Sequence, residues 1–564
     1  MATTVERTPE GILYTPARTR QVPNLDLMTL LFESDLCKAP GSKIITADAE
    51  DPSRHLTKDA LLQQSKRCGH FLRSSFGVGS SGPNEDVVIM IASGHHMIPA
   101  LFYGSIIADG IFSSTSPSAT VDEFAYNLTQ TKAKVVVATT DTKDVALAAA
   151  RKVGMSERSV LVIGGDRELT FTEAHRGAKV PFSNQELDWR RITDPEELAN
   201  STICLLFSSG TTGLPKAMRI SHQNNVAAAY LNLEPMREYN AKHRSPDFEY
   251  VTLAHLPAAH IAGVQGYLVN NTYMGGTCYW MQKFDFPKFL GHVQNYKVTS
   301  MFTVPPIFLL ISKMPIVKDQ LETWVDALSG AAPMGDDLQI AAGKKLGGGK
   351  TKLRQTWGLS ETSGSFTSTP YELLETAPAG SVGALVDSCY ARMVDDDGKD
   401  VEPGQPGEIW CKGPIVTKGY WNNDKANAES FKGEWFCTGD IGVFEDGVFF
   451  IVDRKKELIK YKGIQVAPAE LEALLLSHPK IMDAAVIGVP GEGTEVPRAY
   501  IVANPKEINE QEILEWFKKQ GVAKYKYLRG GVKFLEAIPK SPSGKILRKE
   551  LRDQAKKEFQ TSKL

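Results

Sequence analysis

Residues 208–216 read SSGTTGLPK and directly follow the apolar run ICLLF, which has the length and composition of a buried strand. The glycines of this stretch let backbone N–H groups approach an anion closely, and its four hydroxyl side chains add further donors. A Walker loop is excluded, because Leu214 and Pro215 separate Gly213 from Lys216 and the proline would break the required helix start. The stretch predicts a phosphate-binding loop of another design, with an ordinary Gly/Ser/Thr surface loop as the alternative.

Strand-like and helical stretches alternate on both sides of this loop. The runs KVVVATT, RSVLVIGG, TICLLFSS and YVTLAHLP are separated by helical segments, and this predicts an α/β fold of parallel sheets wrapped by helices. From about residue 380, short strands parted by Gly, Asp and Pro predict a small β-rich subdomain.

A second domain is expected after the lysine-rich link DRKKELIKYKG. The segments AELEALLLSH and QEILEWFKKQ have helical patterns, and DAAVIGVP and RAYIVAN read as strands, which gives a small α+β domain. The expected division is a large N-terminal domain over residues 1–453 and a C-terminal domain over 454–564. A chain of 564 residues is also too long for one hydrophobic core.

Composition narrows the class of protein. A net charge of −2 gives no basis for nucleic acid or an anionic membrane as the main partner. The most apolar long stretch, DVVIMIASGHHMIPALFYGSIIADGIF, is interrupted by histidines, a proline and an aspartate, so a buried strand and helix fit better than a membrane span. Seven scattered cysteines without a CxxC motif predict neither a disulfide framework nor a zinc site. The first residues have no apolar signal region, so no secretory signal is expected.

The sequence ends in a tripeptide that receptors read as an address. Ser562, Lys563 and Leu564 match the peroxisomal targeting signal, which predicts a peroxisomal location and an import receptor as partner. Chance occurrence of the tripeptide is the alternative.

Two further motifs carry side chains suited to nucleotide binding. In QTWGLSE (355–361), Trp357 could stack on a flat ring, Ser360 could bond a phosphate, and Glu361 could hold Mg²⁺. In TGD (438–440), Asp440 would stand in a turn and could grip the two hydroxyls of a ribose. Taken singly, a core tryptophan and a turn-forming aspartate are the simpler interpretations.

The motifs SSGTTGLPK, QTWGLSE, TGD, DRKKELIKYKG and PKSPSGK (539–545), in this order, resemble the adenylate-forming superfamily of acyl-CoA synthetases, firefly luciferase and peptide-synthetase adenylation domains. The resemblance spans nearly the whole chain and is closest to 4-coumarate–CoA ligase-like peroxisomal acyl-CoA ligases. It implies ATP, Mg²⁺ and coenzyme A as cofactors and co-substrates. It also implies a two-step reaction: a carboxylic acid becomes an acyl-AMP with release of pyrophosphate, and the acyl group then passes to CoA with release of AMP.

The resemblance also implies roles for individual residues. The ATP- and AMP-binding residues would be Ser208, Ser209, Gly210, Thr211, Thr212, Gly213, Leu214, Pro215, Lys216, Gly330, Ala331, Ala332, Gln355, Thr356, Trp357, Gly358, Leu359, Ser360, Asp440, Arg454, Lys456, Gln465 and Lys545. Glu361 would hold the metal, and Asp440 with Arg454 would hold the ribose. Lys545 would neutralise charge on the carboxylate and α-phosphate during adenylation.

Thioester formation would use a different face of the C-terminal domain. The resemblance implies that this domain is a mobile lid that rotates about a hinge near Lys456 and presents catalytic Lys460 for the second step. Lys462 and Gly463 would lie near CoA, and Lys283 matches a CoA-contacting lysine of the plant ligases.

The acid would contact His260, Ala262, Gly330 and Gln355. His260 matches the histidine that orients the carboxylate, although a histidine between apolar residues can also be a satisfied core residue. Two residues later the plant enzymes carry an aromatic side chain, and Ala262 departs from that pattern. This predicts a roomier or differently shaped acid pocket.

Several alternatives remain open at this stage. The acid could be a medium-chain fatty acid, a phenylacetate-like acid or a precursor of secondary metabolism. The acceptor could be a carrier-protein thiol or oxygen instead of CoA, which KYKGIQV disfavours. A catalytically inactive binding protein is disfavoured by the presence of Glu361, Asp440, Lys460 and Lys545.

Overall fold

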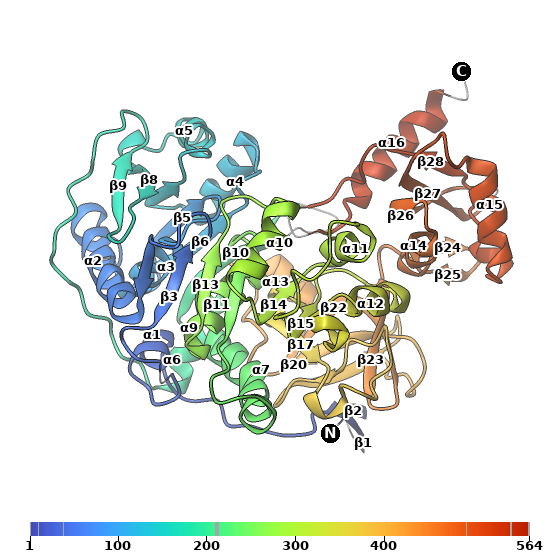
Figure 1. The fold of residues 1–564 in the computed structure, drawn as a ribbon, viewed down its shortest axis with the longest axis horizontal. Coiled ribbons are helices and arrows are strands. Elements are labelled where there is room, and N and C mark those ends of the chain that lie inside the picture. The colour runs from blue at the N-terminus through green and yellow to red at the C-terminus, as the bar shows by residue number, and fades with distance from the viewer. Residues whose placement is uncertain are drawn as a thin grey trace.

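The computed structural model describes residues 2–9, 11–37, 39–208, 214–491, 493–541 and 544–561. Figure 1 shows a large N-terminal body and a smaller C-terminal body that stands to one side of it. The predicted loop residues Ser209–Gly213 and the tripeptide 562–564 lie outside the described residues. Among the described residues, no helix combines the length and apolar character that crossing a membrane would require.

The strand that precedes the phosphate motif lies in a seven-stranded sheet. Its order is β11-β10-β6-β5-β7-β8-β9. The members are β5 (Val87–Ile91), β6 (Ile111–Thr115), β7 (Val135–Ala138), β8 (Val160–Gly164), β9 (Thr170–Glu173), β10 (Thr202–Ser208) and β11 (Lys216–Ser221). The inner strands are parallel, and β9 and β11 are antiparallel edges. The apolar run of β5 is buried along its whole length, as in a sheet covered on both faces.

Helices cover both faces of this sheet. One face packs with α2 (Lys58–Phe76) and α3 (Ile98–Ile107), and the other with α4 (Val121–Thr131) and α5 (Lys143–Lys152). The long apolar stretch therefore forms β5, α3 and β6, as the sequence predicts.

Two further sheets lie beside the seven-stranded sheet in the N-terminal body. One has the order β12-β13-β3-β4 and the other β14-β15-β16-β17-β18. Their members are β3 (Ile44–Asp48), β4 (His55–Thr57), β12 (Val251–Ala254), β13 (Thr277–Trp280), β14 (Ser300–Thr303), β15 (Asp326–Ser329), β16 (Leu353–Leu359), β17 (Gly364–Ser368) and β18 (Ala384–Leu385). The helices beside them include α7 (His222–His243), α10 (Phe286–Asn295), α11 (Pro305–Lys313) and α12 (Asp336–Gly343).

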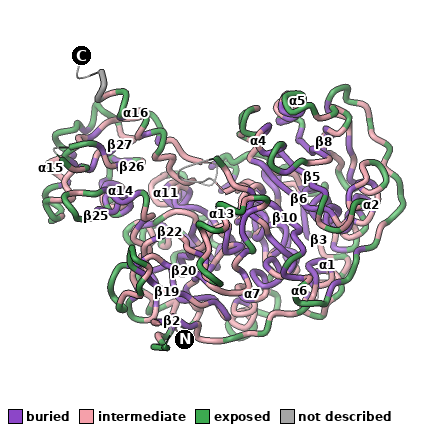
Figure 2. The backbone as a smooth tube through the Cα atoms, turned by 180° about the vertical axis from the view of Figure 1, so that it is seen from behind, coloured by how far each residue is buried: buried purple, intermediate pink, exposed green. Residues whose placement is uncertain are grey.

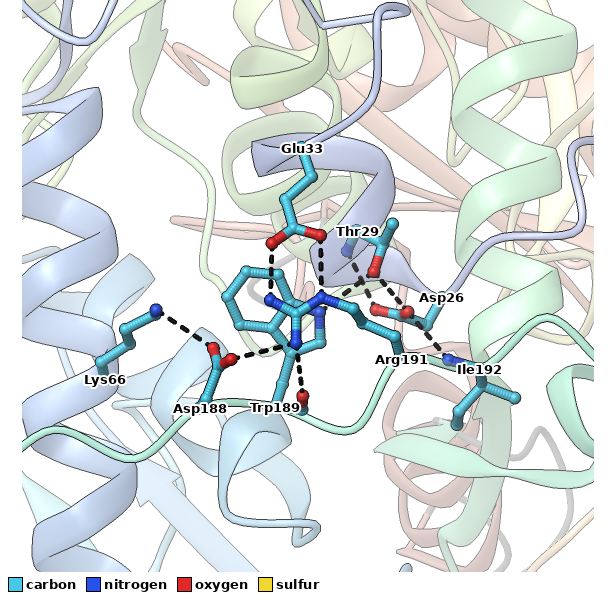
Figure 3. Close-up of polar contacts among 8 residues, drawn as sticks. All are labelled: Asp26, Thr29, Glu33, Lys66, Asp188, Trp189, Arg191 and Ile192. Atoms are coloured by element: carbon cyan, nitrogen blue, oxygen red, sulfur yellow. Dashed lines mark hydrogen bonds and ion pairs between the residues drawn. The ribbon is translucent and has the colours of Figure 1, made fainter.

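Short helical segments connect these layers. They are α1 (Leu27–Phe32), η1 (Glu157–Ser159), α6 (Pro195–Asn200), α8 (Ile261–Gly263), the π-helix η2 (Val264–Asn270), α9 (Asn271–Met274), η3 (Gly347–Gly349), η4 (Ser360–Thr362), η5 (Tyr371–Leu373) and α13 (Asp424–Ser430). The segment before α6 is anchored to α1 through Arg191, which donates to both carboxylate oxygens of Glu33 at 2.9 and 2.6 Å (Figure 3). Asp26 caps α1 and also accepts the Ile192 N–H at 3.2 Å, so the two segments share one polar network.

The predicted β-rich subdomain contains a hairpin from the opposite end of the chain. Its members are β1 (Thr4–Thr8), β2 (Gly11–Thr15), β19 (Tyr390–Val394), β20 (Gly407–Lys412), β21 (Phe431–Lys432), β22 (Trp435–Glu445) and β23 (Val448–Arg454). The hairpin β1–β2 joins because Tyr14 pairs with Ala391 and its buried ring contacts Phe444 and Phe449.

The C-terminal body has its own small core. It contains β24 (Ile459–Tyr461), β25 (Ile464–Val466), α14 (Pro468–Ser477), β26 (Ile481–Pro490), β27 (Glu495–Ala503), α15 (Glu510–Lys519), η6 (Lys524–Lys526), β28 (Val532–Phe534) and α16 (Arg548–Thr561). The predicted helices and strands of this region are all present. Figure 2 shows buried residues in this body separated from the large buried core of the N-terminal body.

Candidate active site

A cavity of about 1630 Å³ lies between the two bodies. Most of the predicted nucleotide and acid residues line it. They are Ser208, Leu214, Pro215, Lys216, His260, Ala331, Ala332, Gln355, Thr356, Trp357, Gly358, Leu359, Ser360, Glu361, Asp440, Arg454, Lys456 and Lys545. The fold thus gathers residues from both bodies around one space.

Glu361 stands on η4, directly after β16, and is held by a side chain that the sequence did not single out. Tyr420 donates its hydroxyl to Glu361 Oε1 at 2.8 Å, and the ammonium of Lys216 lies 4.9 Å from the centre of the Tyr420 ring. The Tyr420 contact occupies one carboxylate oxygen in a fixed orientation. Tyr420 therefore connects the predicted metal ligand with the predicted phosphate lysine.

Asp440 lies in a strand, which corrects the expectation that it stands in a turn. It belongs to β22 and faces Arg454 of β23, with 3.3 Å between Asp440 Oδ1 and Arg454 Nε. Gly439 takes a φ of +69° just before it, so the strand is irregular but continues. Asp440 Oδ1 is buried and has no hydrogen bond from the described residues, so it can accept one from a ribose hydroxyl.

Trp357 is largely buried, as the core-tryptophan interpretation expects. The indole is 7% exposed, and its N–H donates to Asp440 Oδ2 at 2.9 Å. Its ring also packs edge-on against Phe366. Trp357 therefore fixes the carboxylate of Asp440, while part of its surface lines the cavity.

Lys545 reaches the cavity from the turn that precedes α16. The Ser541 N–H donates to the Lys545 carbonyl at 2.8 Å, and Gly544 supplies a φ of +81°. Burial lowers the pKa of Lys545 to about 8, and the positive charge of Arg454 acts in the same direction. Asp440 and Glu361 oppose this shift, and both carboxylates line the same cavity as Lys545.

His260 caps α8 and lies on the same cavity. Its Nδ1 accepts the Ala262 N–H at 3.3 Å, so the neutral ring carries its proton on Nε2. Burial, followed by the charge of Lys545, lowers the pKa of His260 to about 4. A neutral imidazole with a free N–H can donate to a carboxylate oxygen without adding charge.

A second, smaller cavity of about 120 Å³ is lined in part by residues that follow this histidine in the chain. Ala262 and Gln265 line it from α8 and η2, together with Ser300 and Ser363 from neighbouring elements. The Ser300 and Ser363 hydroxyls and Gln265 Oε1 are buried without hydrogen-bond partners among the described residues. Such groups are rare in folded proteins and indicate that something else can satisfy them.

Gly330 and Gln355 were predicted to contact the acid, and both have a structural role in the fold. A Cβ at Gly330 would lie 2.9 Å from the Phe302 ring, so the backbone there approaches this side chain closely. Gln355 donates to the Met334 carbonyl at 3.0 Å and to Gln339 Oε1 at 2.9 Å, and thereby fixes the loop after β15.

The residues predicted for thioester formation do not line the cavity of about 1630 Å³. Lys460 and Gln465 pair across the β24–β25 hairpin, and Lys462 and Gly463 form its turn with φ of +46° and +82°. All four are exposed. Lys283 is also exposed and lies 3.2 Å from Asp141 Oδ2. The structure therefore separates the two predicted catalytic lysines.

The ligand set for a metal is sparse. Within the described ranges, no group of three or more His, Cys, Asp or Glu side chains is arranged to hold a metal ion. Glu361 remains as a single carboxylate with one oxygen held by Tyr420. This fits Mg²⁺, which proteins often bind through one or two carboxylates together with substrate phosphates.

Comparisons with known proteins support the sequence prediction. Residues 33–421 match the AMP-binding enzyme family, and residues 470–545 match the AMP-binding enzyme C-terminal domain. The chain is 42% identical over 550 residues to "Putative acyl-coenzyme A synthetase" of Emericella nidulans, covering 96% of this chain and 98% of the relative. It is 33% identical over 544 residues to the phenylacetyl-CoA ligase epaB of Aspergillus niger, covering 94% and 97% of the two chains.

Solved structures agree in fold. The ATP-bound MatB of Rhodopseudomonas palustris superposes with a TM-score of 0.78 at 25% identity, over 94% of this chain and 98% of MatB. The anthranilate CoA ligase AuaEII, in complex with anthranoyl-AMP, superposes with a TM-score of 0.80 at 22% identity, over 95% and 98% of the chains. The predicted adenylate-forming fold is thereby confirmed. The chain belongs to the AMP-binding enzyme family and is an ATP-dependent acyl-CoA ligase.

Proposed function

We propose that this ligase activates an aromatic or short-chain carboxylic acid that carries a polar group remote from its carboxylate, with Mg²⁺ bound at Glu361. The observation that carries the proposal is the shared cavity of Lys545, Glu361, Asp440, Arg454 and His260. Adenylation brings a carboxylate anion against a phosphate, so fixed positive charge and hydrogen-bond donors at that point stabilise the transition state.

His260, Lys545 and Asp440 have separate parts in the first step. His260 donates from Nε2 to one oxygen of the acid, which leaves the other oxygen free to attack the α-phosphorus. Lys545 neutralises the charge shared by the carboxylate and the α-phosphate. Asp440 accepts from a ribose hydroxyl, supported by the Trp357 N–H at 2.9 Å. Mg²⁺, when bound, offsets charge on the phosphates that leave as pyrophosphate.

The class of acid is argued from the cavity of about 120 Å³. A dry cavity of about 150 Å³ in another protein takes up benzene, so the space beside Ala262 suits one ring or a short chain. Gln265 Oε1 and the Ser300 and Ser363 hydroxyls have no hydrogen-bond partner among the described residues, and they favour a hydroxyl, amide or carbonyl on the acid over a plain alkyl tail.

We also propose that Ser562, Lys563 and Leu564 direct the chain to peroxisomes through an import receptor. The tripeptide itself is the support. Whether the ligase serves fatty acid or secondary metabolism follows from the acid it uses.

A panel of acids tests the proposal in two assays. Acid-dependent ATP–pyrophosphate exchange without CoA measures the first step, and AMP release with CoA measures the whole reaction. We expect higher rates in both assays with hydroxy- or amide-substituted aryl acids than with unsubstituted or long-chain acids of equal carboxylate acidity. The acid proposal fails if long alkyl acids are the best substrates in both assays. An absence of exchange with every acid would point to an inactive binding protein, and exchange without CoA-dependent turnover would point to another acceptor.

A further inference from the structure

Helix α11 contacts the C-terminal body at both of its ends. At its start, Val304 and Pro306 lie against Gly544, where an added Cβ would be 3.4 Å from each of them. At its end, the ammonium of Lys313 donates to backbone carbonyls of the C-terminal body. One helix of the N-terminal body therefore contacts the C-terminal body both at the turn that carries Lys545 and at the end of α14.

The Lys313 contact is concentrated at one helix terminus. Its Nζ donates to the carbonyls of Leu476 at 3.1 Å, His478 at 3.4 Å and Ile481. Leu476 lies in the last turn of α14, His478 caps that helix, and Ile481 begins β26. The last carbonyls of a helix lack intrahelical partners and carry partial negative charge, so a cation there is favourable.

A short series of contacts leads from this point to the catalytic turn. Two residues beyond Ile481, Asp483 accepts from the Lys540 ammonium at 2.6 Å. Lys540 in turn pairs through its backbone with Ile546, the residue after Lys545. The carbonyl that Lys313 holds and the turn that carries Lys545 thus belong to one hydrogen-bonded unit.

We propose that Lys313 is a positioning residue that docks the C-terminal body in the orientation that places Lys545 in the active site. The three carbonyls belong to the C-terminal body, so any rotation that presents the distant Lys460 must break this contact. Lys313 also lines the 1630 Å³ cavity, but the hydrogen bonds of its ammonium within the described ranges go to these three carbonyls and not to Glu361, Asp440 or Trp357. Its effect is therefore on the equilibrium between orientations.

The inference rests on the proposed role of Lys545 in adenylation, and the experiment separates the two. Lys313→Met keeps the aliphatic stem and removes the donors. We expect ATP–pyrophosphate exchange to fall about three- to tenfold, where tenfold corresponds to about 1.4 kcal/mol of orientation free energy. KM values for ATP and acid should stay unchanged, and CoA thioester formation from supplied acyl-adenylate should be equal to or faster than in the wild type.

Three matched variants complete the test. Lys313→Arg keeps a cation with several donors and should recover part of the lost exchange rate. Lys318→Met changes an exposed lysine five residues further along the chain and should leave both half-reactions unchanged. Lys545→Ala tests the proposed function alone. If this variant keeps the wild-type rate of ATP–pyrophosphate exchange, the proposed role of Lys545 is refuted independently of the results for Lys313.

The inference is overturned if Lys313→Met lowers the rates of both half-reactions equally or lowers neither rate. It is also overturned if Lys313→Arg has the same rates as Lys313→Met in every assay. Thermal unfolding of each variant gives the fold control. A Lys313→Met protein that unfolds at the wild-type temperature and loses only adenylation supports the positioning role.

Discussion

Alkaline pH should slow adenylation through Lys545. Burial and the nearby charge of Arg454 lower the pKa of Lys545 to about 8, so its ammonium loses a proton as the pH rises through that value. At pH about 9 roughly one tenth of the ammonium would remain, one pH unit above the pKa being a tenfold change. Because the cation is needed to neutralise the carboxylate and the α-phosphate, the rate should fall in proportion.

The assay is kcat/KM for ATP in the pyrophosphate-exchange reaction between pH 6.5 and about 10, since this quantity reports pKa values of the free enzyme. We expect an alkaline limb centred near pH 8 and about a tenfold loss by pH 9. Lys545→Arg keeps its charge throughout this range, so whatever its absolute rate, its profile should lack the limb. Thioester formation from supplied acyl-adenylate should instead rise towards pH 8.5, because the thiolate is the nucleophile.

The reasoning would be refuted by a flat wild-type profile up to pH 10, or by an unchanged limb in Lys545→Arg. Either result would mean that Lys545 is not the titrating cation of the first step. An alkaline limb that also appears in the second step would point to loss of the fold, which thermal unfolding at each pH would detect.

Three other changes test separate parts of the site. Tyr420→Phe removes the hydroxyl bound to Glu361 and should raise the Mg²⁺ concentration needed for half-maximal exchange by about 10–100-fold. An unchanged Mg²⁺ concentration for half-maximal exchange would exclude Tyr420 from metal binding. Ala262→Tyr should fill the small cavity and lower kcat/KM for bulky acids relative to small ones by about 1–3 kcal/mol, with little change in KM for ATP. Equal losses for small and large acids would show that this position does not shape the pocket. Deleting residues 562–564 should leave activity intact and move the protein to the cytosol, and continued peroxisomal location would contradict the targeting role.

Local sequence patterns were sufficient to predict the layers of the fold. The buried strands around ICLLF and the helices of the C-terminal body could be predicted from the spacing of apolar residues alone, because that spacing is visible within a short segment of sequence. The nucleotide motifs could be read for the same reason, since each is a short segment whose residues act together. Asp440 was the exception among them: a Thr-Gly-Asp sequence is typical of a turn, but pairing with Arg454 keeps it in a strand.

Contacts between distant segments were not predictable from one sequence. Tyr420 and Glu361 are 59 residues apart, and Trp357 and Asp440 are 83 residues apart. Neither pair has a local pattern, because each contact depends on how the β-rich subdomain packs on β16. The N-terminal hairpin was missed for the same reason, since Tyr14 finds its partner Ala391 only in the folded chain.

The positions of the two lysines bear on the proposal that one cavity serves both half-reactions. Lys545 lines the cavity together with Asp440, Arg454 and Glu361, while Lys460 is exposed on the β24–β25 hairpin of the same small body. Lys460 therefore cannot enter the cavity by a side-chain movement alone. For Lys460 to act there in the proposed second step, the whole C-terminal body would have to turn, which would withdraw Lys545 and break the Lys313 contact in the same motion. In this proposal Lys545, which neutralises the carboxylate and the α-phosphate, leaves the cavity before the thiol arrives, so the thiol meets the acyl-adenylate only after it has formed.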